Sequence, residues 1–235
     1  MNSREIINDI PIYWINLDRS PERRERMEQM FEEHGITNHH RVVAVDAKNI
    51  DVDEIYKSKH FRIKYKKRKM TATEIAIMMS HKKAIQQAYE DNLSNLALII
   101  EDDCLFDFLK YHTIDLRTLF SKCRRKTILQ LALNVSEYIA NCFKEEYLSG
   151  IKVKKGFANS ATAYLIHRNY MTSIFDTKNI CIADTRDGLY SSKTYISLMP
   201  YFTFNYIEST NCSTRNNKHK KCHERWKNIL EDINI

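Results

Sequence analysis

The sequence contains little glycine and proline, with only 4 glycines and 3 prolines in 235 residues. A β-sandwich or barrel of many short hairpins needs more turn residues than this, so that architecture is excluded. No apolar run reaches the roughly 18 residues that a membrane-spanning helix requires. The composition therefore favours a protein of helices and long strands that does not cross a membrane.

Cysteine spacing and the amino-terminal stretch indicate the compartment. The 6 cysteines show no CxxC pair, so neither a zinc site nor a redox pair is indicated. The stretch MNSREIINDIPIYWINL carries charges where a signal peptide would be apolar. We therefore expect a cytoplasmic protein whose thiols are reduced.

A chain of 235 residues fits one large α/β domain or two small ones. It has no internal repeat and no linker rich in Pro, Gly or Ser, so we expect a single domain over residues 1–235. Within it we expect a basic mobile loop at residues 57–69. At residues 213–235 we expect a basic tail followed by a short helix.

The net charge of +7 comes from one segment. Lys57 to Lys69 (KSKHFRIKYKKRK) holds eight Lys and Arg and no acid, which leaves the other residues with a net charge of −1. Such a block is typical of a solvated loop; the alternatives are contacts with phosphates, acidic acceptors or a membrane surface. Phe61 and Tyr65 leave single-stranded nucleic acid open as the less favoured partner.

Strand and helix patterns alternate along the chain, which predicts a βαβ unit at the amino terminus and an α/β fold. In the first expected helix Pro21 lies in the first turn and Gly35 at the end, and Thr71 and Glu74 have the spacing of a capping box. We expect strands at residues 10–17, 41–47, 96–100, 127–133, 161–167 and 194–199, and helices at residues 20–35, 71–92 and 168–176.

Three adjacent acids, Glu101, Asp102 and Asp103, directly follow the apolar run LALII. Unit charges about 5 Å apart repel by roughly 3 kcal/mol at an effective dielectric constant near 20, so the cluster needs water, an Arg or Lys, or a metal ion. A solvated strand end, with Asp103 capping a following helix, is one interpretation. The expected position at the carboxyl end of a central parallel strand favours a ligand site instead.

Adjacent carboxylates suit a hard divalent cation, Mn²⁺ or Mg²⁺, that also binds a diphosphate. Nucleotide-sugar transferases need such a cation because the nucleoside diphosphate that leaves carries developing negative charge. Phosphatases and nucleases use similar clusters, so the acids alone do not decide between these classes.

Several motifs, in order, resemble glycosyltransferase family 25. They are YWINLDRSPERRERM, TATEIAIMMSHKKAI and ALIIEDD, followed more weakly by SATAYLIHRNY and IADTRDGLYSSKTYISLMP. The resemblance implies a GT-A-type, Rossmann-like nucleotide-sugar fold whose mostly parallel central sheet is flanked by helices. It also implies Mn²⁺, a UDP-sugar donor with galactose ahead of glucose and N-acetylglucosamine, and transfer with inversion to a glycan, glycoprotein or glycolipid. The missing signal peptide fits a bacterial or viral enzyme.

The resemblance also assigns roles by position. Asp103 would be the principal metal ligand, and Glu101 would bind metal or ribose. His219 and His223 are further candidates for the metal shell. The residues expected to bind the donor are Asn16, Leu17, Asp18, Arg19, Thr73, Glu74, His81, Glu101 and Asp102.

An inverting transfer needs a carboxylate that takes the proton of the acceptor hydroxyl. Asp184 and Asp187 are the candidates, and Asp184 aligns better with the family because it lies 16 residues before Pro200. Asp184 as a helix cap is the structural alternative.

Each other candidate also has a purely structural interpretation. Arg23 and Arg24 are expected to be solvated rather than to contact the diphosphate, and His81 to be buried or capping rather than catalytic. A turn cap is the less favoured alternative for Asp18. His219 and His223 are expected to lie in a mobile tail. For the whole chain, the alternatives to a transferase are a non-catalytic module of the same fold that binds acidic polymers or membrane headgroups, and a UDP-sugar hydrolase.

Overall fold

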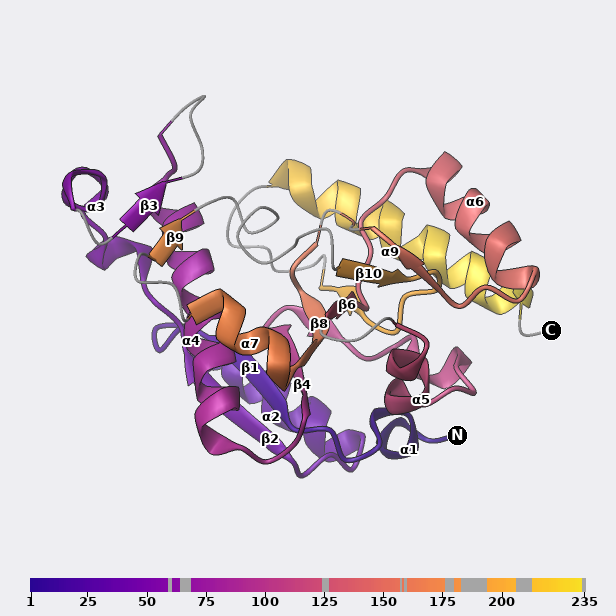
Figure 1. The fold of residues 1–235 in the computed structure, drawn as a ribbon. Coiled ribbons are helices and arrows are strands. Elements are labelled where there is room, and N and C mark those ends of the chain that lie inside the picture. Colours follow the sequence, from indigo (N-terminus) through magenta and orange to yellow (C-terminus); the bar gives the residue numbers. More distant parts are fainter. Residues whose placement is uncertain are drawn as a thin grey trace.

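The computed structural model describes residues 1–58, 61–63, 69–123, 127–156, 158, 160–175, 180–182, 194–205 and 213–233. These residues confirm the expected α/β class, with helices packed on a seven-stranded sheet (Figure 1). In spatial order the strands are β2 (His39–Val43), β1 (Ile12–Asn16), β4 (Leu96–Glu101), β8 (Ala163–His167), β6 (Ile128–Gln130), β10 (Thr194–Ser197) and β7 (Val153–Lys155).

The sheet is mixed in strand direction. β2, β1 and β4 pair in parallel, as the expected βαβ unit requires, and β6 and β10 also pair in parallel. β8 pairs antiparallel with both β4 and β6, and β7 pairs antiparallel with β10. The expectation that the acids follow a central parallel strand is therefore half right, because β4 has one parallel and one antiparallel neighbour.

Alternate residues of the buried strands supply two hydrophobic cores, one on each face of the sheet. Leu98 and Ile100 of β4 belong to the same core as Met27 and Phe31 of α2 (Pro21–Glu33). Ala97 and Ile99 belong to the core that α4 (Ala72–Asp91) and α7 (Arg168–Phe175) complete. Strands that are buried on both faces read as continuous apolar runs, which is why the sequence shows them clearly.

Local signals in the sequence account for α2 and α4. Pro21 occupies the first turn of α2, and Gly35 follows the helix with a φ of +64°, a value that glycine adopts without strain. Thr71 and Glu74 form the expected capping box at the start of α4. α2 begins just after the carboxyl end of β1, and α4 leads into the amino end of β4.

The remaining elements are shorter. Two small sheets pair β5 (Cys104–Leu105) with β11 (Thr203–Phe204), and β3 (Phe61–Ile63) with β9 (Ile180–Ile182). The other helices are α1 (Ser3–Ile7), α3 (Val52–Lys57), α5 (Leu116–Ser121), α6 (Glu137–Leu148), α9 (Ser213–Ile233) and the 3₁₀ turns η1 (Ala47–Asn49) and η2 (Leu109–Tyr111).

The carboxyl-terminal segment corrects the sequence interpretation. A basic tail followed by a short helix was expected, but α9 is a continuous helix of 21 residues. Cys222, Trp226 and Leu230 of α9 are buried in a third core with Ala140 of α6. The basic residues of α9 conceal this apolar stripe in the sequence, because cations and apolar residues alternate within each turn.

The structure describes only part of the basic segment at residues 57–69. β3 lies within it, and the ammonium group of Lys69 contacts Asp53 of α3 at 2.6 Å. Residues 59, 60 and 64–68, which carry most of the cations, lie outside the described residues.

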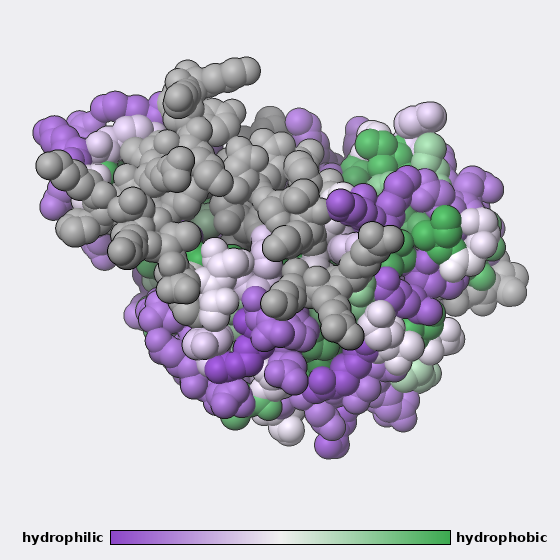
Figure 2. Space-filling view, viewed as in Figure 1, coloured by the Kyte–Doolittle hydropathy of each residue, from purple (hydrophilic) through white to green (hydrophobic). Residues whose placement is uncertain are grey.

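Exposed apolar side chains gather around α6. Figure 2 shows them on the side of the molecule where α6 and α9 lie. They are Tyr138, Ile139, Leu148 and Ile151. No helix in the described parts of the chain is long and apolar enough to cross a membrane.

Candidate nucleotide-sugar site

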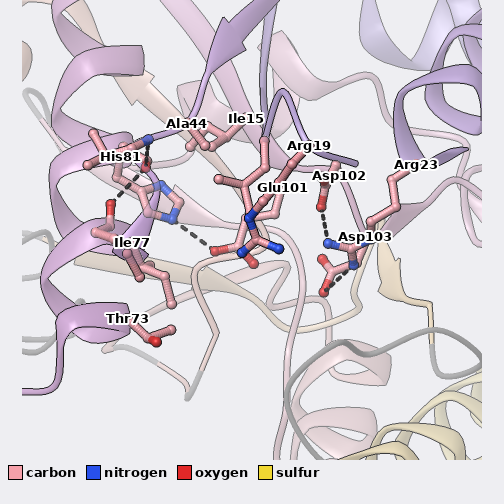
Figure 3. Close-up of a pocket in the computed structure, with 15 residues that line it drawn as sticks. Ile15, Arg19, Arg23, Ala44, Thr73, Ile77, His81, Glu101, Asp102 and Asp103 are labelled. Carbon is pink, nitrogen blue, oxygen red and sulfur yellow. Dashed lines mark hydrogen bonds and ion pairs between the residues drawn. The ribbon is translucent and has the colours of Figure 1, made fainter. Parts of the chain in front are cut away.

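A pocket of about 190 Å³ lies at the carboxyl ends of β1 and β4, where ligands bind in open α/β sheets (Figure 3). The turn after β1, the first turn of α2, the segment after β2, one face of α4 and the acidic triplet border it. Its lining residues are Ile15, Leu17, Arg19, Arg23, Ala44, Val45, Ala47, Thr73, Ala76, Ile77, Ser80, His81, Glu101, Asp102 and Asp103.

Both oxygens of Glu101 are hydrogen-bonded. Oε1 lies 3.0 Å from Nε2 of His81, and Oε2 accepts a hydrogen bond from the Thr162 hydroxyl at 3.2 Å. Burial raises the pKa of Glu101, but His81 and the Thr162 hydroxyl outweigh burial and bring the pKa below its ordinary value. Glu101 is therefore the acid of the triplet whose pKa is lowered.

Asp102 is the most deeply buried of the three acids, with 6% of its surface exposed. Asn16 donates to its Oδ2 at 2.8 Å, and a guanidinium nitrogen of Arg23 lies 2.6 Å from its Oδ1. Burial raises the pKa of Asp102, while Arg23 and Asn16 act against that rise. Asp102 thus ties β1, β4 and α2 together and has no oxygen left without a partner.

Asp103 differs from its neighbours. Its Oδ2 lies 4.0 Å from Arg23, and its buried Oδ1 has no hydrogen-bond partner among the described residues. Burial and the Glu101 carboxylate raise the pKa of Asp103 to about 7, although Arg23 acts against them. No helix follows Asp103, because the chain continues into β5, so the helix-cap interpretation is wrong.

Arg23 was expected to be solvated, and the structure contradicts this. It is 9% exposed and faces Asp102 and Asp103 (Figure 3). Its Nε–H is buried and has no acceptor in the part of the chain that the structure describes. The signal was available in the sequence, since the first turn of a helix after the first strand lies at the edge of the sheet where β4 ends. Arg24 is exposed and pairs with Glu28, as expected of a solvated arginine.

A divalent cation fits Asp103 better than it fits the other two acids. An orphaned, buried carboxylate oxygen is a hard ligand of the kind that Mn²⁺ and Mg²⁺ prefer. The oxygens of Glu101 and Asp102 already have partners, and the described residues contain no group of three His, Cys, Asp or Glu arranged to hold a metal. The protein would therefore supply few ligands, and phosphate or water oxygens would supply the rest.

The residues after β1 separate into lining and supporting positions. Leu17 and Arg19 line the pocket, and Arg19 is held by Asp46 at 2.7 Å. Asn16 is buried and holds Asp102, so it supports the acidic triplet. Asp18 is outside the pocket lining and lies 2.7 Å from Arg41.

On α4, the predicted positions also differ in what they contact. Thr73 lines the pocket, whereas the Glu74 carboxylate accepts from the Thr71 backbone in the capping box. Ser80 accepts from the backbone N–H of Val45 at 2.9 Å, which ties the segment after β2 to α4. His81 is 1% exposed, so the buried interpretation of this histidine is correct.

The two carboxyl-terminal histidines do not line the pocket. His223 is 8% exposed and stacks on Phe108, and His219 stacks on Phe204. Both lie on α9, so the expectation of a mobile tail is wrong. Asp184 and Asp187, the expected acceptor bases, lie outside the described residues.

Comparisons with known proteins agree with this geometry. A family model described as "Glycosyltransferase family 25 (LPS biosynthesis protein)" matches residues 9–184, which include every residue of the pocket lining. Two curated proteins named "Glycosyltransferase 25 family member", from Drosophila pseudoobscura pseudoobscura and Drosophila melanogaster, are 37% and 36% identical over 101 residues. That stretch is 41% of this chain and 16% of each relative, so the chain matches only a small part of their length.

Proposed function

Since the chain belongs to glycosyltransferase family 25, we propose that it transfers a hexose from a UDP-sugar to a hydroxyl group of a glycan, glycoprotein or glycolipid. One observation carries the proposal: two side chains of opposite charge at the same pocket each have one buried polar atom without a hydrogen-bond partner among the described residues. These are Nε–H of Arg23 and Oδ1 of Asp103. A diphosphate with its bound cation would supply both an acceptor for the arginine and a positive charge for the carboxylate.

The pocket lining combines apolar and cationic residues, as a nucleotide requires. Ile15, Ala76 and Ile77 make one part apolar, as stacking or enclosing a base requires. Arg19 and Arg23 bring positive charge near the acids. A planar guanidinium group can donate two hydrogen bonds to a phosphate, and this geometry holds the leaving group in place.

Asp103 is the residue we propose as the cation ligand, with Mn²⁺ preferred and Mg²⁺ as the alternative. When bound, the cation would neutralise negative charge on the departing diphosphate. Arg23 would hold the same diphosphate from the α2 side. Asp102 would support the acidic triplet, since Asn16 and Arg23 hold its oxygens. Glu101, which His81 and Thr162 hold in place, would contact the nucleotide-sugar.

For proton transfer we propose Asp184 as the acceptor base, with Asp187 as the second candidate. Among UDP-sugars we propose galactose, ahead of glucose and N-acetylglucosamine. Both proposals rest on the resemblance of the sequence to the family. The choice of Asp184 also rests on chemistry, because an inverting transfer needs a carboxylate base.

Calorimetry with a panel of UDP-sugars tests the donor and the cation together. UDP-galactose, UDP-glucose and UDP-N-acetylglucosamine are titrated into the protein with Mn²⁺ and, as the control, with EDTA. We expect binding that depends on the cation and is tightest for one sugar. Failure to bind UDP or any UDP-sugar in the presence of Mn²⁺ would overturn the proposal.

Release of UDP with and without an acceptor separates the rival functions. A transferase releases UDP in proportion to acceptor, a hydrolase releases it without acceptor, and a binding module releases none. Asp184→Asn should lower transfer by roughly two to four orders of magnitude and leave UDP affinity unchanged. If transfer stays within a few-fold of wild type, Asp184 is not the base and Asp187→Asn is the next variant to measure.

A further inference from the structure

The histidine beside the acidic triplet is placed to act on Glu101 and not on a substrate. His81 has both ring nitrogens engaged: Nδ1 lies 3.1 Å from the Tyr164 hydroxyl and Nε2 lies 3.0 Å from Oε1 of Glu101. It is 1% exposed. A general base needs a free nitrogen that can reach the substrate, and His81 has none free for a substrate proton.

The direction of these hydrogen bonds follows from the chemistry of the groups. An ionised carboxylate only accepts, so Nε2 of His81 carries a proton and donates it to Glu101. A neutral imidazole that donates from Nε2 accepts at Nδ1, and the Tyr164 hydroxyl is the group placed to donate there. The result is a chain of donors that runs from Tyr164 through His81 to Glu101.

The far end of this chain is anchored in the sheet. Tyr164 lies in β8, is 0% exposed, and belongs to the core between the sheet and α4. Its ring centroid lies 5.7 Å from that of His81, so the two rings are packed as well as hydrogen-bonded. The orientation of the imidazole is therefore set from the core and not from the pocket.

A second attachment holds the other oxygen of Glu101. The Thr162 hydroxyl donates to Oε2 at 3.2 Å, and the Glu101 backbone N–H donates to the Thr162 carbonyl at 2.9 Å. With one donor on each oxygen, rotation of the carboxylate breaks at least one hydrogen bond. The orientation of the Glu101 carboxylate in the pocket lining is thus fixed.

We propose that His81 is a positioning residue that, with Tyr164 and Thr162, holds the Glu101 carboxylate in the orientation that binds the nucleotide-sugar. The proposal rests on the proposed function for its ligand. His81 itself would contact neither the donor nor the reacting atoms.

The test compares a variant of His81 that cannot donate a hydrogen bond to Glu101 with a variant that can. His81→Leu cannot donate to Glu101 and should weaken binding of UDP with Mn²⁺ by about tenfold or more, the effect of one hydrogen bond to a charged group. In His81→Gln the side-chain amide can donate to Glu101 and accept from Tyr164, so affinity should return to within about threefold of wild type.

The molecule contains a matched control. His112 is also buried, stacks on Tyr201, and donates a hydrogen bond from Nε2 to the Pro200 carbonyl at 2.9 Å, outside the pocket. His112→Leu should lower the melting temperature but leave UDP affinity unchanged. Equal UDP affinity in wild type, His81→Leu and His81→Gln would overturn the proposal. So would His81→Gln with unchanged KM and a kcat lowered a hundredfold, because that is the result for a general base.

Nitrogen NMR of the histidine side chains tests the geometry without any nucleotide. In the free protein, Nε2 of His81 should be protonated; an unprotonated Nε2 would overturn the proposal. If Nε2 is protonated but the wild-type protein binds no UDP, the proposed function fails and the positioning of Glu101 by His81 stands.

Discussion

The two sides of the acidic triplet differ in how completely their charges are satisfied. On one side, each oxygen of Glu101 has a hydrogen-bond donor, from His81 or Thr162. On the other side, Oδ1 of Asp103 has no partner among the described residues, and its nearest cation, Arg23, is 4.0 Å from Oδ2. Two carboxylates separated by one residue thus have opposite pKa shifts, lowered for Glu101 and raised to about 7 for Asp103.

This difference indicates that Glu101 is already held in place by the protein, whereas Asp103 has an oxygen that a bound cation could fill. A carboxylate with a hydrogen-bond donor on each oxygen is stable as it stands, whereas a buried oxygen without a partner carries a desolvation penalty. That penalty is relieved when a cation binds. The following variants test whether the division between the two sides is real.

Asp103→Asn should have the largest effect. Removal of the anionic oxygen should abolish Mn²⁺-dependent UDP binding and lower transfer by about a thousandfold or more, roughly 4 kcal/mol. Because the change also removes a repelling charge, the melting temperature should hold or rise. Asp107→Asn, at an exposed aspartate outside this pocket, is the control. Unchanged UDP affinity with Mn²⁺ present would show that Asp103 does not hold the cation.

Arg23→Met should have the next largest effect, on stability. Asp102 is buried and would lose its charged partner, and breaking a buried ion pair costs roughly 3 kcal/mol of unfolding free energy. Urea unfolding measures this loss. Arg24→Met removes an exposed arginine one position away and should leave stability unchanged. Equal stabilities for the two variants would show that the ion pair between Arg23 and Asp102 does not stabilise the fold.

The pH dependence of stability should differ between wild type and Asp103→Asn in EDTA. The folded-state pKa of Asp103 is about 7, above its ordinary value of 3.8, so between these values the folded state binds a proton that the unfolded state releases. Wild type should therefore lose stability, relative to the variant, by up to about 1.4 kcal/mol per pH unit as pH rises through this window. Parallel stability curves from pH 4.5 to 8 would count against the raised pKa.

Thr162→Val should have the smallest effect, because His81 still holds the other oxygen of Glu101. The loss of one hydroxyl donor should cost about 1 kcal/mol of UDP affinity, a several-fold rise in the dissociation constant measured by calorimetry. Thr127→Val removes an equally buried hydroxyl outside the pocket and serves as the control. A loss as large as that of Asp103→Asn would erase the difference between the two sides.

Local signals were enough to predict much of the amino-terminal half. The apolar run of β1, Pro21 in α2 and the capping box of α4 each act within a few residues, so the sequence shows them directly. The same holds for the acidic triplet, whose mutual repulsion is evident from adjacency alone. The resemblance to glycosyltransferase family 25 also rests on these local motifs, and the family match confirms it.

Long-range contacts account for what the sequence interpretation missed. β8 lies antiparallel between β4 and β6, and α9 buries its apolar stripe against α6 and the end of the sheet. Nothing within either segment specifies a partner that is distant in the chain. Strand direction and the burial of a basic helix therefore could not be predicted from pattern.

By itself, the sequence determined the α/β class, the position of the acids at a strand end and the family. Only the tertiary structure decided that Arg23 is buried, that His81 is engaged on both nitrogens, and that Asp103 alone among the three acids has an oxygen without a partner in the described residues. The physical reason is that residues adjacent in the sequence can have different surroundings in the folded protein. Desolvation and hydrogen bonding are set by groups from α2, α4 and β8, which meet the triplet only when the chain folds.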